Sequence, residues 1–120
     1  MPKKILVCDD DLDFARLIMA KLKSEGYEVV IAADSIQSVA LAHKEKPDLI
    51  LLDIKMPAGG VYTVHEKLRL SSATMSIPVI LVSALPFETV REHAAQLGVS
   101  DFQIKPCQPE EIIKKIEKLI

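Results

Sequence analysis

Five polar residues stand where short apolar runs of this sequence end. Asp9 and Asp10 follow ILVC, and the other three end their own runs: Asp53, Ser83 and Lys105. In a parallel sheet covered by helices, ligands bind beyond the carboxyl ends of the strands, so these side chains are expected at one edge. Clustered carboxylates suit Mg²⁺, and a carboxylate can also take up a phosphoryl group as an acyl phosphate. A lysine and a hydroxyl can bind the remaining phosphate oxygens, so the set favours phosphoryl transfer.

The acidic run at residues 9–13 has three interpretations, because aspartates can start a helix, bind calcium or share a magnesium site. A calcium loop beginning at Asp9 requires glycine where Phe14 stands and glutamate where Ala20 stands, so that interpretation fails. Asp11 and Asp13 are expected to begin a helix, where a carboxylate opposes the positive end of the dipole. Asp9 and Asp10 gain a metal-binding role only because Asp53, Ser83 and Lys105 are expected at the same edge of the sheet.

Five apolar runs alternate with amphipathic segments along the chain. The expected strands are ILVC (5–8), YEVVIA (27–32), DLILLD (48–53), PVILVSA (78–84) and DFQIK (101–105). Between and after them apolar residues recur at helical spacing, namely Phe14, Leu17, Ile18, Leu22, Ile36, Val39, Ala40, Val61, Val64, Leu68, Phe87, Val90, Ala94, Leu97, Ile112, Ile113, Ile116 and Leu119. The central runs are apolar on both faces, so we predict a parallel α/β sandwich in one domain. Gly26 and Gly98 are expected to follow helices, and Pro109 to begin one.

Bulk properties limit the possible functions. The chain has 120 residues, a net charge of −2 and a pI of about 5.9, and it lacks a basic stripe, which argues against direct nucleic-acid binding. No segment reaches membrane-spanning length, and the N-terminus lacks the apolar run of a signal peptide. We therefore expect a cytoplasmic protein in which Cys8 and Cys107 are reduced thiols rather than a redox switch. The chain stops after its fifth helix, so no effector domain is visible.

Four motifs resemble the receiver domains of two-component response regulators: ILVCDDD, LILLDIKMP, PVILVSA and DFQIKP. They occur in order across essentially the whole chain. The resemblance implies one response regulatory domain over residues 1–120, a flavodoxin-like fold with a doubly wound five-stranded parallel sheet of order 2-1-3-4-5 and five helices. It also implies phosphorelay signal transduction rather than activity as an enzyme.

The resemblance further implies a role for each acidic residue. Asp53 is expected to accept a phosphoryl group from the phosphohistidine of a histidine kinase or a histidine phosphotransfer protein, in a Mg²⁺-dependent reaction. Asp10 is expected to bind Mg²⁺ directly, with Asp9 assisting through water. Asp53 itself and the backbone carbonyl of Lys55 are expected to complete the protein's ligands to the metal.

The remaining implied roles concern the response to phosphorylation. Lys105 is expected to pair with the phosphoryl group and to precede Pro106 through a cis peptide bond. Ser83 is expected to move to bind a phosphoryl oxygen, and Phe102 to rotate inward with it. The surface of the fourth helix, last strand and last helix then changes, to be read by a downstream effector protein or domain, or by a second copy in a phosphorylation-dependent homodimer.

Two departures from the family pattern affect the expectations. The stretch Ala58-Gly59-Gly60-Val61 replaces the Gly-Met-Asp-Gly that commonly follows Met-Pro, which affects kinase recognition and the entry to the third helix. Lys55 and Leu85 stand at positions that tune attack of water on the acyl phosphate. Neither carries a carboxylate or amide that orients water, so we expect a long-lived phospho-Asp53.

Two other functions compete with this interpretation. A phosphorylation-independent pseudo-receiver would be a pure interaction module, although the complete acidic, hydroxyl and lysine set argues against it. A strand ending in Asp9-x-Asp11 also resembles haloacid-dehalogenase-type phosphotransferases, in which Asp9 would be the nucleophile and Asp53 a supporting residue. Those enzymes generally need a longer chain with a cap and a further acidic motif.

Overall fold

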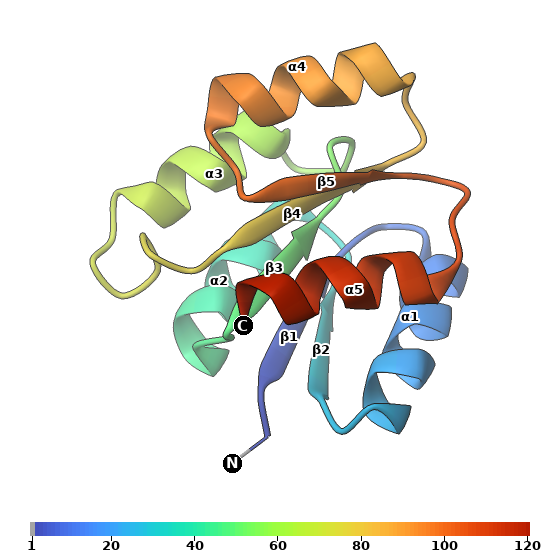
Figure 1. Ribbon diagram of the computed structural model, residues 1–120. Coiled ribbons are helices and arrows are strands. Elements are labelled where there is room, and N and C mark those ends of the chain that lie inside the picture. Colours follow the sequence, from blue (N-terminus) through green and yellow to red (C-terminus); the bar gives the residue numbers. More distant parts are fainter. Residues whose placement is uncertain (1) are drawn as a thin grey trace.

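The computed structural model describes residues 2–120 as a five-stranded parallel sheet between two layers of helices (Figure 1). The elements are β1 (Lys4–Cys8), α1 (Leu12–Ser24), β2 (Glu28–Ala32), α2 (Ser35–Glu45), β3 (Leu49–Leu52), α3 (Val61–Arg69), β4 (Val79–Ser83), α4 (Phe87–Leu97), β5 (Asp101–Ile104) and α5 (Pro109–Leu119). The strand order is β2-β1-β3-β4-β5. The predicted fold is confirmed, and each predicted strand agrees with the observed one to within one residue at either end.

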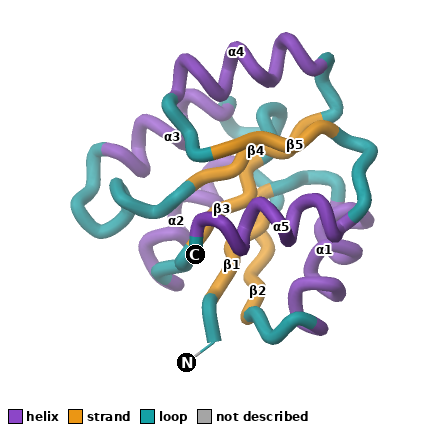
Figure 2. The backbone as a smooth tube through the Cα atoms, in the orientation of Figure 1, coloured by secondary structure: helices purple, strands orange, loops and turns teal. Residues whose placement is uncertain are grey.

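Alternate residues of the strands pack against different helix layers. Ile5 and Val7 of β1 pack with α1 and α5, whereas Leu6 and Cys8 pack on the other face with α2, α3 and α4. Figure 2 shows the strands between these two layers. Because each face is covered, β3 and β4 are buried throughout and β1 is buried from Ile5 onward, which explains their continuous apolar runs.

Helix boundaries follow from local chemistry. Asp11 is the N-cap of α1, where its Oδ1 accepts a hydrogen bond from the Phe14 N–H at 3.1 Å, and Asp13 lies in the first turn. Pro109 is the first residue of α5, and Gly98 ends α4 in the left-handed region with φ 67°. These boundaries were predicted, and together with the strand ends they fix where the loops of the carboxyl edge begin.

Helical periodicity overestimated how much of each helix is buried. Leu17, Ile36 and Phe87 fall on the apolar repeats, yet they are 56%, 67% and 54% exposed. The reason is geometric: a helix lying on a sheet buries one stripe of its surface, and on α1 that stripe contains Ala15, Ile18 and Leu22 but not Leu17.

The two cysteines lie in different layers. Cys8 packs in the core under α2, α3 and α4, and Cys107 packs against the core under α1 and α5. Both are free thiols. Across residues 2–120, no helix combines the length and the apolar character needed to cross a membrane.

Candidate functional site

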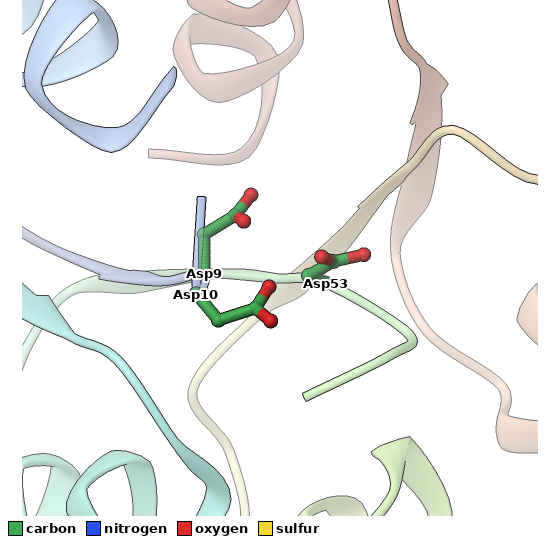
Figure 3. Close-up of side chains that lie close together, drawn as sticks. All are labelled: Asp9, Asp10 and Asp53. Carbon is green, nitrogen blue, oxygen red and sulfur yellow. The ribbon is translucent and has the colours of Figure 1, made fainter. Parts of the chain in front are cut away.

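Three carboxylates meet at the carboxyl edge of the sheet. Asp9 and Asp10 follow β1, Asp53 follows β3, and one oxygen from each lies within 4.8 Å of the others (Figure 3). Sheet hydrogen bonds continue one residue past the strands and hold these backbones: the Asp9 N–H donates to Ala32 O and the Asp53 N–H to Cys8 O, both at 2.9 Å. The spacing of the acids is therefore set by the sheet rather than by mobile loops.

Asp9 is the buried member of the group. Its side chain is 2% exposed, and both oxygens are engaged: Oδ2 accepts a hydrogen bond from Lys105 Nζ at 2.7 Å, and Oδ1 accepts one from the Asp11 N–H at 2.9 Å. A carboxylate this buried needs such partners, because an unpaired charge away from water is costly. Asp9 is therefore a fixed anchor for Lys105.

Asp53 lies beside this pair, and its Oδ2 is 3.8 Å from Lys105 Nζ. Burial raises the pKa of Asp53 to about 6, the Lys105 ammonium opposes that rise, and the negative charge of Asp9 adds to it. One lysine cannot neutralise the charge of both Asp9 and Asp53. A second cation close to Asp53 would therefore favour its ionised form.

Asp10 and Asp53 open into a cavity of about 300 Å³ that is also lined by Lys55, Ser83 and Lys105. Asp10 is exposed, so its oxygens can reach an incoming ion. Three ionised carboxylates and one ammonium leave two formal negative charges, which matches a divalent cation. Carboxylate oxygens with room for water are the ligand set typical of Mg²⁺, so the residues present fit that metal.

Ser83 and Phe102, the two residues expected to move on phosphorylation, lie at different distances from the acidic pocket: Ser83 lines its cavity, and Phe102 lies on β5. Ser83 is 2% exposed and its Oγ accepts a hydrogen bond from the Leu85 N–H at 3.2 Å, at the wall of the cavity. Phe102 is half-buried on β5 and contacts Phe87 edge-to-face, with ring centroids 5.4 Å apart. The Lys105–Pro106 peptide bond is cis. Thus the sequence-predicted residues gather at one edge, and Phe102 lies farther back on its strand.

One neighbour of the site was missed from the sequence. Phe14 was assigned to the apolar stripe of α1, but Lys105 Nζ lies 4.3 Å from the centroid of its ring. Sequence spacing carries little sign of this contact, because the two residues are far apart in the chain and meet only in the tertiary structure.

Comparisons with known proteins identify the family. The chain matches the response regulator receiver domain over residues 5–117. It is 39% identical to the response regulator PleD of Caulobacter vibrioides over 119 residues, which are 99% of this chain and 26% of that protein. The chain spans 26% to 49% of the length of curated relatives such as PleD and RpaA of Synechocystis.

Solved structures of receiver domains have the same fold as this chain. The receiver domain of the sensor histidine kinase PA1611 from Pseudomonas aeruginosa, which has a magnesium ion coordinated in its active-site cleft, superposes with a TM-score of 0.90 at 28% identity, covering 99% of this chain and 98% of that one. The chemotaxis protein CheY4 of Vibrio cholerae gives a TM-score of 0.91 at 24% identity, with both chains fully covered, and supports the fold alone.

The chain therefore belongs to the response regulator receiver domain family. It is a receiver module of phosphorelay signalling. Asp9, Asp10 and Asp53 form the acidic pocket in which a receiver domain coordinates Mg²⁺.

Proposed function

We propose that Asp53 is the phosphoacceptor of this receiver domain, which comprises residues 1–120. The observation that carries the proposal is the position of its carboxylate, which lines the open cavity while Lys105 lies 3.8 Å away. Asp9, the nucleophile required by a dehalogenase-type mechanism, has both oxygens engaged and does not line that cavity. The geometry therefore supports Asp53 over Asp9.

The chemistry is a phosphoryl transfer from a phosphohistidine. An Asp53 oxygen forms a bond to phosphorus while the bond from phosphorus to the donor imidazole nitrogen breaks, and the electron pair of that bond returns to the ring. The product is an acyl phosphate on Asp53 and a free histidine on the kinase or the histidine phosphotransfer protein. Lys105 needs to move only from Asp9 toward Asp53 to meet the added oxygens.

We assign the metal site to Asp10 and Asp53, with the backbone carbonyl of Lys55 as a further ligand. Mg²⁺ held by these residues would supply charge neutralisation for the phosphoryl oxygens. Asp9 supports the site through water and through Lys105, since its own oxygens already accept hydrogen bonds. The PA1611 receiver, with its magnesium ion in the corresponding cleft, supports this assignment.

Phosphorylation is proposed to act through the loop that joins β4 to α4. Ser83 Oγ accepts a hydrogen bond from the Leu85 N–H in this structure, and a turn of the Ser83 side chain to donate its O–H to a phosphoryl oxygen would disturb that bond. The same loop leads into α4, whose Phe87 contacts Phe102, and Lys115 of α5 donates a hydrogen bond to Phe102 O at 2.5 Å. A change at Ser83 would thus reach the surface of α4, β5 and α5, which an effector or a second copy of the chain would read.

The deciding experiment measures covalent phosphorylation by intact mass after incubation with Mg²⁺ and phosphoramidate. Wild type is expected to gain one phosphoryl group, Asp53→Ala none, and Asp13→Ala the same as wild type, since Asp13 is an exposed acid on the first turn of α1. A phosphoryl group that persists on Asp53→Ala would refute the assignment. Absence of any response to phosphoramidate or beryllofluoride would instead favour the pseudo-receiver.

A slow loss of the phosphoryl group is also proposed. Leu85 is half-buried and lines the cavity, where an apolar side chain gives attacking water no hydrogen-bond partner. Leu85→Glu is expected to speed autodephosphorylation roughly tenfold, because a carboxylate there can orient water. The decay of phospho-Asp53 measured after removal of the donor tests this, and an unchanged rate in the variant would contradict it.

We further propose a cytoplasmic location, which suits two free thiols in a protein served by a histidine kinase. The mildly acidic net charge of −2 supports a protein partner over direct contact with nucleic acid or an anionic membrane.

A further inference from the structure

The ammonium of Lys105 has three close neighbours, two of which are carboxylates. It donates a hydrogen bond to Asp9 Oδ2 at 2.7 Å and lies 3.8 Å from Asp53 Oδ2. The third neighbour is the face of the Phe14 ring, 4.3 Å from the ammonium nitrogen to the centroid. The lysine side chain is 12% exposed, so the ring and the carboxylates make up much of its surroundings.

An aromatic face attracts a cation through its quadrupole, and the attraction is stronger where water is excluded. Unlike a carboxylate, the ring adds no charge to a site that already has an excess of negative charge. Unlike a hydrogen-bond acceptor, it sets no single N–H direction. An ammonium can therefore slide across the ring while it changes its carboxylate partner from Asp9 to Asp53.

The same loop that places Asp9 also places Phe14. The Asp9 Oδ1 accepts a hydrogen bond from the Asp11 N–H at 2.9 Å, and the Asp11 Oδ1 accepts one from the Phe14 N–H at 3.1 Å. Lys105 contacts both ends of this chain of hydrogen bonds, because its ammonium lies against the Asp9 carboxylate and the Phe14 ring. The ring is half-buried against the core under α1 and α5, which restricts its movement.

We propose that Phe14 is a positioning residue for the phosphorylation reaction, because its ring face holds the Lys105 ammonium between Asp9 and Asp53. This inference rests on the proposed function of Asp53 and adds a residue to it. Phe14 touches neither the phosphoryl donor nor the acceptor, and it acts through Lys105.

Nuclear magnetic resonance tests the contact without any phosphorylation. The ring current of Phe14 shifts the Lys105 Cε protons upfield, and this shift is expected to disappear in Phe14→Leu and to persist in Phe14→Tyr. Lys115, whose ammonium lies 5.9 Å from the Phe102 ring, is the internal control and should keep its signals in both variants. Unchanged Lys105 signals in Phe14→Leu would overturn the proposal.

Kinetics test the consequence. With phosphoramidate and Mg²⁺, the rate constant at saturating donor is expected to fall about threefold to tenfold in Phe14→Leu, while Phe14→Tyr stays within about twofold of wild type. Half-saturation by the donor should change little, because Phe14 does not contact it. Leu17→Ala, an exposed site on the same helix, controls for general disturbance of α1. Equal loss in the leucine and tyrosine variants would show a packing role and overturn the proposal.

A series of fluorinated side chains at position 14 tests the proposal even if Phe14→Leu folds poorly. Replacing Phe14 with mono-, di- and trifluorophenylalanine weakens the ring face stepwise at nearly constant shape. The logarithm of the rate constant is expected to fall in step with the fluorine count, and a flat series would refute the proposal. If wild type itself gains no phosphoryl group on Asp53, the proposed function fails, while the resonance experiment still reports on the contact.

Discussion

Two lysines of this chain each lie between two carboxylates, at opposite ends of the same sheet. At the amino edge, Lys4 Nζ is 3.1 Å from Glu45 and 3.9 Å from Glu28, whose side chains are 26% and 56% exposed. At the carboxyl edge, Lys105 Nζ is 2.7 Å from Asp9 and 3.8 Å from Asp53, whose side chains are 2% and 11% exposed. The distances are nearly equal, and the surroundings are very different.

The comparison shows that ion-pair distance alone does not reveal a functional site. The carboxylates around Lys4 keep more contact with water, which screens their interaction with the lysine. Those around Lys105 are held in a confined space with Asp10 as a third acid, and burial raises the pKa of Asp53 to about 6. A surplus of buried negative charge, rather than the pairing itself, marks the carboxyl edge as a site for a cation.

The largest expected difference comes from removing each ammonium while keeping its carbon chain. Lys105→Met leaves the Asp9 carboxylate buried without its partner and is expected to lower the free energy of unfolding by about 3 kcal/mol. Lys4→Met is expected to cost less than about 1 kcal/mol, because Glu28 is exposed and Glu45 keeps partial contact with water. Urea unfolding in metal-free buffer measures both, and equal losses would contradict the distinction drawn between the two edges.

Magnesium should stabilise the protein through the carboxyl edge. At a Mg²⁺ concentration ten to thirty times its dissociation constant, the free energy of unfolding is expected to rise by about 1 to 2 kcal/mol. Asp10→Asn should remove most of this gain, since Asp10 is the exposed carboxylate of the pocket. Glu45→Gln, the matched change beside Lys4, should leave it intact, and a similar loss in that variant would place the metal elsewhere.

The free energy of unfolding should depend on pH through His65 of α3. Burial lowers the pKa of His65, and the nearby Arg69 guanidinium lowers it further. The folded protein then binds this proton less well than the unfolded chain, so stability is fully present above the unfolded pKa and is lost as the pH falls below it.

Solvent screening limits this loss to less than about 1 kcal/mol between pH 7.5 and 5. The variant His65→Gln should show a smaller decline over that range in urea unfolding. An identical pH profile for the two proteins would show that His65 does not contribute.

The smallest effects are expected at two strained backbone positions, one at each edge. Lys46 ends α2 at φ 49°, and Ala58 lies in the loop after Asp53 at φ 67°. Glycine adopts this region without steric cost, so Lys46→Gly and Ala58→Gly should each raise the free energy of unfolding by about 0.5 to 1 kcal/mol. Only Ala58→Gly should also alter the phosphorylation rate, because its loop borders Asp10 and Lys55. A changed phosphorylation rate in Lys46→Gly would contradict this distinction between the two edges of the sheet.

Sequence by itself determined the order of the elements and the identity of the reactive edge. Strand limits could be predicted to within one residue, because apolar runs covered on both faces have a clear pattern. Asp9, Asp10, Asp53, Ser83 and Lys105 could be placed together because parallel strands bring their carboxyl ends to one edge.

Tertiary structure decided what each of these groups touches. It placed Asp9 in a buried pair with Lys105, left Asp10 open to the cavity, and brought the Phe14 ring to within 4.3 Å of the ammonium. It also exposed Leu17 and Phe87, although both fall on apolar helical repeats. Periodicity records which side of an element is apolar, but contacts between distant residues and the water left around them arise only when helices pack on the sheet.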